Sequence, residues 1–569
     1  MRRAALGVLG TIVCLATFSA AANKNAQIPK DQRITQALNR LTFGARPGDA
    51  AAVRAMGLKK WIDLQLHPER IPENPVLEAK LKELDTLRMS SEELVRNYPT
   101  PQMVKQMMAG QMPFPTDPER RVLIEKLVAK YENKQAAGGT TPPPPGAPQA
   151  QALRDILSPE QIRALRQGTP EQRVAMFQAL PLEKQVDAIG AMGPPMRQAM
   201  FAAAPPELRR KLILANGPQQ VVQRDLTDAK MLRAIYSNRQ LDEVLVDFWF
   251  NHFNIYLDKG ADRYLVTEYE REAIRPHVLG KFRDLLEATA KSPAMLFYLD
   301  NWQSVGANVP AGRSQGNRRR GLNENYGREL LELHTLGVDG GYTQKDVTEV
   351  ARCFTGWTIN QPQRGGKFTF APRQHDNGEK VVLGVTIPAG GGMEDGEKVL
   401  DIVAHNPATA RFISRKLAQR FVADEPAASL VDAMAQTFVK SDGDIRAVLT
   451  AMFNSKEFWS VGAYRSKMKS PLEMVASAVR AVNGDVDYAF ALTNQVAQLG
   501  EPLYRKQEPT GYSNSSQEWL NSAGLVARMN FALQLADNKV PGVKVEGPQA
   551  AKPDDAQGIA LGSPEFQKR

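Results

Sequence analysis

The stretch NENYGRELLELHTLGVDGGYTQKDVTEVARCFTGW, residues 323–357, contains two patterns that are typical of amphipathic α-helices. At about 100° per residue, the apolar side chains of the first pattern share one arc of a helical wheel. Gly337 has the position of a glycine that ends a helix, and Thr343 and Asp346 have the spacing of a capping box. We therefore expect two helices joined by a short turn, with the first burying Tyr326, Leu330, Leu333 and Leu336.

Three polar residues of the first pattern do not fit a solvent-exposed face. Glu329 falls within the apolar arc, and Asn323 and His334 border it. A polar group turned toward a protein core destabilises the fold by several kcal/mol unless it finds a partner. We therefore expect Glu329 and His334 to meet polar groups from other segments. The remaining charged residues lie on the opposite side, where surface ion pairs explain them: Glu324, Arg328 and Glu332.

These residues predict a site built from carboxylates and histidines. Its expected members are Glu329, as general base or metal ligand, with His252, Asp300, Asn325 and His334 around it. A divalent metal is compatible with this set if His252 and Asp300 supply ligands, because Glu329 and His334 lie about 140° apart around one helix. A histidine on an apolar face is also typical of a hydrogen-bonded core residue, and this alternative stays open for His252. The chain has no phosphate-loop or H-E-x-x-H motif that would indicate another cofactor.

Helical patterns dominate the rest of the second half of the chain. Apolar spacing of three and four residues recurs in LDEVLVDFWFNHFNIYL (241–257), in EREAIRPHVLGKFRDLLEATA (270–290) and in TARFISRKLAQRFV (409–422). Strands are scarce, and one hairpin is expected near 367–387, with its turn at Asn377 and Gly378. That turn also explains His375 and Asp376. The expected fold is mainly α: a multi-helix globular domain with one small β-hairpin and a proline-phased insertion of short helices.

Two insertions and a linker divide this helical domain. Residues 30–87 and 223–540 are expected to form the main domain, and 88–137 a helical insertion. The run GGTTPPPPGAPQAQA (138–152) indicates a semi-rigid linker. In 153–222, prolines recur every eleven to fourteen residues, each before good helix formers, and Ser158 with Gln161 and Thr169 with Gln172 have capping-box spacing. The inward positions expected there are Ile162, Leu165, Val174, Phe177, Leu208 and Leu212, and 541–569 is expected to be a disordered tail.

The first 22 residues have the layout of a secretory signal. Two arginines precede an apolar run and then small residues, with cleavage expected near Ala21 or Ala22. The apolar run is shorter than the ~20 residues that span a bilayer, and no later segment is long and apolar enough. We expect an exported protein of the periplasm or cell surface, without a transmembrane segment in the mature chain; a retained anchor is the alternative. Cys353 would then be the sole cysteine, and its apolar spacing predicts a buried, unreactive thiol.

The formal net charge of +10 and the pI near 9.3 would suit an anionic partner. An anionic polymer of the cell envelope fits this charge and the expected export. Nucleic acid is a poor candidate, because the chain carries no nucleic-acid-binding motif. The densest basic cluster is NRRR (317–320), in a loop that contains Gly and Ser, where a solvated loop is the simpler explanation.

Several stretches together resemble the bacterial family named domain of unknown function 1800 (DUF1800). They are ALNRLTFGARPGD (37–49), FWFNHFNI (248–255), AMLFYLDN (294–301), the 323–357 block, HNPATARFISRKLAQRFV (405–422), YRSKMKSPLEMVASAVRA (464–481), LGEPLYRKQEPTGY (499–512) and WLNSAGLVARMNFAL (519–533). The resemblance runs from about Gln36 to Leu535. It implies an exported, mostly helical protein whose partner is an exported protein resembling sulfatases and phosphatases, and it implies no reaction or catalytic residues.

Two functions of different classes follow from these observations. The first is a non-catalytic binding or assembly protein that works with an enzyme of the cell envelope. The second is an exported hydrolase that acts on a surface polysaccharide or its ester groups through the site around Glu329. The sequence indicates no substrate, metal or oligomeric state.

Overall fold

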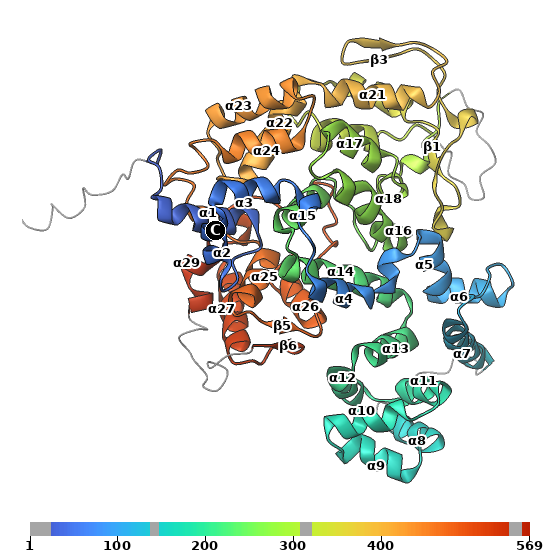
Figure 1. Cartoon of the computed structure of the whole chain (residues 1–569). Helices are drawn as coiled ribbons and strands as arrows, with labels where there is room; N and C mark the ends of the chain where they lie inside the picture. The colour runs from blue at the N-terminus through green and yellow to red at the C-terminus, as the bar shows by residue number, and fades with distance from the viewer. Residues whose placement is uncertain (1–23, 137–146, 308–320, 546–559) are drawn as a thin grey trace, which may run out of the picture.

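The fold is described from a computed structural model for residues 24–136, 147–307, 321–545 and 560–569. The expectation of a mainly helical protein is confirmed (Figure 1). The predicted signal, the proline run up to residue 146 and the NRRR cluster lie outside the described residues. No helix of the described part is long and apolar enough to cross a membrane.

The main body combines the start of the chain with its second half. Its first elements are α1 (Lys30–Leu41), α2 (Asp49–Met56), α3 (Leu58–Gln65), η1 (Pro68–Arg70), α4 (Pro75–Lys82) and η2 (Asp85–Arg88). Its middle elements are α14 (Gln219–Tyr236), α15 (Gln240–His252), α16 (Asp262–Glu268), η3 (Tyr269–Ile274), η4 (Arg275–His277), α17 (Phe282–Ala290), α18 (Pro293–Tyr298), η5 (Asn301–Gln303), α19 (Asn325–Glu329), η6 (Leu330–His334) and α20 (Gln344–Cys353).

The later elements complete the main body. They are η7 (Pro362–Arg364), η8 (Pro372–Gln374), α21 (Glu394–Ala404), α22 (Pro407–Phe421), α23 (Ala428–Lys440), α24 (Ile445–Phe453), α25 (Pro471–Ala481), α26 (Phe490–Gln498), η9 (Ser516–Trp519), α27 (Ser522–Ala536) and α29 (Pro564–Gln567). One continuous apolar core runs through the main body, from Ile28 to Leu561. Cys353 is fully buried in it, and burial raises the pKa of the thiol to about 12, as expected for an unreactive cysteine.

The proline-phased region forms a satellite of short helices with a core of its own (Figure 1). We call α8–α13 the satellite: α8 (Ala147–Ile156), α9 (Pro159–Gln167), α10 (Pro170–Gln178), α11 (Leu182–Ala191), α12 (Pro194–Ala203) and α13 (Pro206–Asn216). Four of these helices begin at a proline, and the capping boxes Ser158–Gln161 and Thr169–Gln172 are both formed. Of the six predicted inward residues, Leu165, Phe177, Leu208 and Leu212 are buried, and Ile162 and Val174 pack against them partly buried.

The other insertion, 88–137, supplies α5 (Ser91–Asn97), α6 (Pro101–Met108) and α7 (Pro118–Ala136). These helices share a smaller apolar cluster with the end of α13, the start of α14 and Tyr264 of α16. This cluster joins the insertion to the main body. The end of the predicted linker differs from expectation, because residues 147–152 already belong to α8.

The strands pair differently from the single hairpin that the sequence predicts. The described strands form three two-stranded antiparallel sheets: β1 (Trp357–Ile359) with β2 (Phe368–Phe370), β3 (Lys380–Val382) with β4 (Val385–Ile387), and β5 (Asp485–Val486) with β6 (Val543–Lys544). The tight turn of the second hairpin is at Leu383 and Gly384, both with positive φ, and not at Asn377 and Gly378. The segment between β2 and β3 instead buries His375 and Asp376.

The end of the chain is a second correction. A disordered tail was expected from 541, but β6 pairs with β5, and Lys568 forms an antiparallel bridge with Met468. Leu561, Gln567 and Arg569 are buried against the main body. Few apolar residues mark this segment in the sequence, so its packing depends on long-range contacts that a local pattern does not reveal.

The helix of the 323–357 block also differs from the regular wheel. After Glu329 the chain continues as the π-helical turn η6. Because a π-turn closes on the fifth residue and not the fourth, the side chains after Leu330 are rotated relative to a regular helix. Leu331 is therefore fully buried and Leu333 only partly, whereas Tyr326, Leu330 and Leu336 are buried as expected.

Candidate functional site

The two predicted histidines lie together in the core. The ring Nε2 of His252 donates to the backbone oxygen of His334 at 3.0 Å, and the two ring centroids are 6.3 Å apart. Burial lowers the pKa of both imidazoles, His334 to about 3, and the positive charge of Lys416 adds to the effect. Both rings are therefore neutral near pH 7. His252 Nδ1 and His334 Nε2 have no hydrogen-bond partner among the described residues.

The other predicted residues gather at the end of α18. Asp300 has a left-handed backbone, with φ of 61°, and its carboxylate accepts from Lys259 at 2.9 Å. The amide of Asn325 donates to the backbone oxygen of Leu299 at 3.3 Å. Glu329 is close enough to Tyr298 to raise the pKa of that phenol. No described contact joins His252 to Asp300 or to Glu329, so the five residues divide into two groups.

Glu329 does not have the partner that an inward acid was expected to need. It is partly buried, and it forms no ion pair or hydrogen bond with a described residue. Burial, together with the nearby charge of Glu332, raises the pKa of Glu329. Water can still solvate a carboxylate that is only partly buried, which removes most of the cost of leaving it unpaired. Among the described residues, no group of three or more His, Cys, Asp or Glu side chains is arranged to hold a metal ion.

A polar pocket lies between α14, α15, the start of α25 and the 501–519 segment. We call it the Glu501 pocket; it has a cavity volume of about 50 Å³, room for a few water molecules. Five of the stretches that resemble the family contribute to its wall. The lining residues from them are Phe248, Phe250, Asn251 and Asn254; Arg420; Met468, Ser470 and Glu473; Glu501, Leu503, Tyr504 and Tyr512; and Trp519.

A lysine and an aspartate face each other across the α14–α15 side of this pocket. The ammonium of Lys230 lies 2.8 Å from Asp247, above the rings of Phe250 and Tyr504 at 5.4 and 4.9 Å. Burial alone would lower the pKa of Lys230, but the carboxylates of Asp247 and Glu270 raise it above its usual value. The pair is therefore ionised, with the cation shielded by aromatic rings.

Glu501 provides the pocket with a neutral acid. Burial raises the pKa of Glu501 to about 8, and the charge of Asp247 contributes in the same direction. One carboxyl oxygen accepts from the backbone amide of Leu472 at 2.8 Å, which fixes its position at the first turn of α25. At pH 7 the pocket thus combines a protonated carboxyl at Glu501 with the carboxylate of Asp247, which is ion-paired with Lys230.

Another part of the pocket lining is a buried group of three charged residues, Glu473, Arg420 and Arg569. Glu473 contacts the guanidinium groups of Arg420 and Arg569, the latter at 2.7 Å, and its second oxygen caps α25 by accepting from the Ser470 amide at 2.9 Å. Burial would raise the pKa of Glu473, but the two arginines hold it at about 2. Glu473 therefore stays ionised near pH 7, and of these two acids it is Glu501 that carries a proton.

Asn251 near the end of α15 and Asn254 just after that helix fix the loop that closes the pocket. Asn251 exchanges hydrogen bonds with the backbone of Tyr512, at 2.7 and 2.6 Å, and Asn254 donates to the backbone oxygens of Lys506 and Glu508, both at 2.9 Å. Gly511 has φ of 68°, and a Cβ there would lie 2.1 Å from the Asn251 backbone oxygen. Only glycine allows this close approach.

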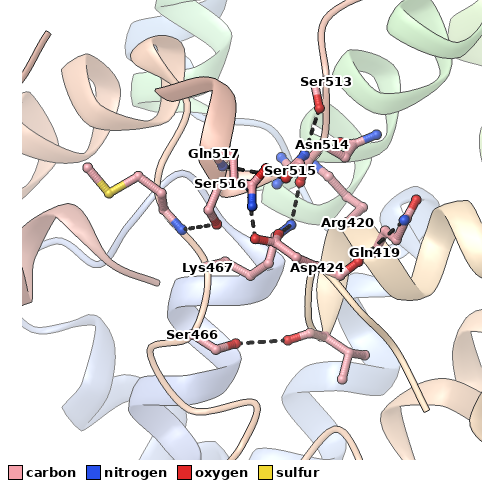
Figure 2. A network of polar contacts seen from close by, with 12 residues as sticks. Gln419, Arg420, Asp424, Ser466, Lys467, Ser513, Asn514, Ser515, Ser516 and Gln517 are labelled. Carbon is pink, nitrogen blue, oxygen red and sulfur yellow. Dashed lines mark hydrogen bonds and ion pairs between the residues drawn. The ribbon is translucent and has the colours of Figure 1, made fainter. Parts of the chain in front are cut away.

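A second network holds the next part of the same loop, which Figure 2 shows from close by. Lys467 binds both the carboxylate of Asp424 and the backbone oxygen of Asn514. The other Asp424 oxygen accepts from the Ser516 amide at 3.0 Å, and the Ser516 hydroxyl accepts from the Met468 amide at 2.9 Å. The ion pair of Lys467 with Asp424 therefore holds the part of the pocket lining around Ser513 and Asn514 in place.

The sequence did not indicate Glu501, Asp247 or Lys230 as site residues. Lys230 and Asp247 lie on consecutive helices, Glu501 lies more than 250 residues further along the chain, and no motif or periodicity connects them. A signal existed in the conspicuous acids within apolar surroundings, LVDFWF at Asp247 and LGEPLY at Glu501. An acid within an apolar stretch is expected to be buried, but the sequence does not show which of these acids lie close together in the fold.

The fold and the pocket define a mainly helical protein with a charged core and an inserted helical satellite. The chain belongs to the family described as protein of unknown function (DUF1800), whose model matches residues 36–567. No curated protein and no solved structure matches the chain. The family accounts for nearly the whole chain and brings no assigned reaction.

Proposed function

We propose that the protein is exported and binds a cell-envelope polymer through a small polar group, of hydroxyl size, that enters the Glu501 pocket. The observation that carries the proposal is the convergence of five family-resembling stretches on one pocket with ionised and neutral polar groups. Buried charges destabilise a fold when their pairing is incomplete, so a pocket that keeps several of them is a candidate binding site. Polar hydroxyl groups would find an acceptor at Asp247 and a donor at Glu501.

The test compares binding by purified variants. Soluble polysaccharide released from the bacterial envelope is titrated against wild type, Asp247→Asn and the matched control Asp339→Asn, an exposed acid outside the pocket. We expect Asp247→Asn to weaken binding at least tenfold, because an ionised acceptor is lost, and the control to bind as wild type does. Equal binding by all three proteins would refute the pocket as the binding site.

Hydrolysis of the same polymer or its ester groups is the second candidate function. It is favoured by one observation, the pKa of about 8 at Glu501 beside Asp247, which is paired with Lys230. Glu501 would donate a proton to the leaving oxygen, and Asp247 would accept one from water or stabilise positive charge. Glu501→Gln decides between the functions, because glutamine resembles a protonated glutamate but cannot give up a proton. Binding alone predicts near-normal affinity, whereas hydrolysis predicts loss of turnover with affinity kept.

Assembly with an exported protein resembling sulfatases or phosphatases is part of the same proposal. The family resemblance is its motivation, and the satellite is the expected contact surface, because its helices carry no residue of the Glu501 pocket. Crosslinking in intact cells followed by mass spectrometry tests it. Crosslinks between such a protein and satellite lysines, such as Lys184, are expected; crosslinks confined to the main body would contradict the contact surface.

Export has its own direct test. Mass spectrometry of the protein purified from its native cells should find an N-terminus after Ala21 or Ala22. An intact N-terminus in the cytoplasmic fraction would refute export, and an intact N-terminus in the membrane fraction would support the retained anchor.

A further inference from the structure

A groove separates the 88–137 insertion from the loop between β1 and β2. Its cavity volume is about 420 Å³, within the range of ligand sites, and it lies between α5 and η7, which contact each other. We call it the α5 groove, lined by Glu92, Val95, Arg96, Met112, Pro113 and residues 360–367 except Pro362 and Gln363. It shares no residue with the Glu501 pocket.

The loop that forms one side of the groove has an unusual backbone. Gln361 has φ of 52°, a left-handed conformation that is uncommon outside glycine and recurs at ligand sites. A Cβ on Gly365 would lie 2.4 Å from the Ser91 backbone, and one on Gly366 would lie 1.3 Å from the Asn360 oxygen. Gly365 therefore lets the loop backbone pack directly on the start of α5, and Gly366 lets the loop close on its own backbone at Asn360.

The charges around the groove favour an anionic ligand. Arg96 is paired with Glu92 at 3.1 Å, and Glu92 is the lining acid. Arg364 and Lys367 form no ion pair with a described residue; Arg364 uses one N–H group on the backbone oxygen of Gln111 at 3.0 Å. Lys367 also lines a second cavity of about 250 Å³, beside Glu268 and Lys291, so it stands between two hollows. Two cations without acidic partners thus face the same concave surface.

The remaining lining residues indicate that the anionic ligand is a saccharide. Asn360 and Gln361 are exposed, and their side-chain amides have no hydrogen-bond partner among the described residues, so they are free to bind hydroxyl groups. Val95, Met112 and Pro113 offer an apolar surface for the C–H face of a sugar ring. The lining contains no aromatic ring on which a nucleic-acid base could stack.

We propose that the α5 groove binds a carboxylate-bearing saccharide unit, with Arg364 and Lys367 holding the carboxylate. The proposal rests on the proposed function only for the source of the ligand, an envelope polymer, and not on the chemistry of the Glu501 pocket. It gives the 88–137 insertion a role, because α5 and the segment after α6 form one side of the groove. The polymer would then contact the protein at a site separate from the Glu501 pocket.

The test measures binding of tetragalacturonate to the full chain by calorimetry. The Arg364→Ala/Lys367→Ala variant should bind at least tenfold more weakly than wild type. A matched control, Lys59→Ala/Lys60→Ala, removes two exposed cations of α3 and should bind within twofold of wild type. The methyl ester of tetragalacturonate, which keeps the shape and lacks the charge, should lose affinity for wild type to a similar degree. Lys367→Gln alone, at an exposed side chain without protein contacts, should weaken binding several-fold without changing the melting temperature.

Several results would overturn the proposal. Absence of tetragalacturonate binding to wild type, equal affinity for its methyl ester, or equal losses in the control variant would each do so. Tighter binding of single-stranded oligo(dT) that depends on Arg364 and Lys367 would assign the groove to nucleic acid instead. Loss of binding in Asp247→Asn with full binding in the groove variant would move the ligand to the Glu501 pocket, refuting the groove and leaving the proposed function in place.

Discussion

The main body and the satellite are both helical, but they are stabilised in different ways. The satellite core is apolar, and its described side chains include one buried charge, Arg209, which lies 2.8 Å from Asp487 of the main body. The main body instead buries a chain of charged groups, among them Lys230, Glu243, Glu270 and Glu473. Apolar packing and helix caps are sufficient to form short helices. Buried ion pairs contribute little net stability, so their concentration in the main body indicates function.

The junction between the satellite and the main body combines charged side chains with apolar rings. Arg224 of α14 lies over the ring of Phe490 at 3.5 Å and over Phe201 of α12 at 4.7 Å. Arg209 of α13 lies over Tyr488 at 4.6 Å. Cation–π contacts of this kind, together with the small apolar cluster at the end of α13, hold the satellite on the main body. The satellite core itself is separate from the core of the main body, so we expect the two regions to unfold in separate transitions.

The largest effect is expected from removing a buried charge. Arg275 binds both oxygens of Glu243, at 2.9 and 3.0 Å, and Glu270 at 2.9 Å. Arg275→Met leaves two buried carboxylates without this partner and should lower the free energy of unfolding of the main body by about 3–5 kcal/mol in urea. Arg96→Met, at an exposed pair, should cost less than about 1 kcal/mol. Equal losses in the two variants would contradict the contrast between buried and exposed charge.

A smaller effect is expected in the satellite core. Leu165 is 2% exposed and surrounded by apolar side chains. Leu165→Ala should lower the stability of the satellite by about 3 kcal/mol through lost burial and a cavity. Hydrogen exchange followed by mass spectrometry should show faster exchange in 147–216 and unchanged exchange in α15 and α25. Faster exchange throughout the chain would mean that the two regions unfold as one.

Acid should destabilise the main body through the buried histidines. The pKa of His334 is about 3 in the folded protein, below the ~6.5 of an unfolded chain, so its contribution is present above pH 6.5 and is lost as the pH falls toward 3. Between pH 7 and 4.5, wild type should lose about 2 kcal/mol relative to His334→Asn, which does not titrate. The satellite contains no histidine, and its transition should not differ between the two proteins. Parallel pH profiles for the main body would contradict the assignment.

The smallest effect is expected at a helix cap. The Thr169 hydroxyl accepts from the Gln172 amide, and the Gln172 side chain accepts from the Thr169 amide at 3.0 Å. Thr169→Ala should lower satellite stability by about 1 kcal/mol, because one amide at the start of α10 loses its acceptor. Chemical denaturation followed by hydrogen exchange at α10 measures it. An unchanged satellite would mean that proline at the first helical position is sufficient to start the helix.

The satellite was more predictable from the sequence than the site. Prolines 159, 170 and 206 begin helices, and capping boxes depend on residues three apart, so local patterns are enough to predict them. The hairpins failed because strand pairing is set by partners: Phe368–Phe370 pairs with Trp357–Ile359, a segment with no alternating pattern of its own. The π-turn at Leu330 similarly changed which leucines are buried.

The site required contacts that no local pattern contains. His252 and His334 were named from their helices, and the structure brings them into contact, but Glu329 and Asp300 belong to another group. The Glu501 pocket joins α14, α15, α22, α25 and the 501–519 segment. Its acidity depends on burial and on the charge of Asp247, neither of which a single sequence determines.

The central claim is that the main body keeps a protonated acid at Glu501 beside the ionised Asp247. Infrared difference spectroscopy of the carboxyl groups between pH 5 and 9 tests it directly, with Glu501→Gln to assign the band. We predict one carboxyl that titrates near pH 8 in wild type and is missing in the variant. If the Glu501→Gln difference spectrum shows no carboxyl that titrates above pH 6, the pocket holds an ordinary ionised glutamate and the account is wrong.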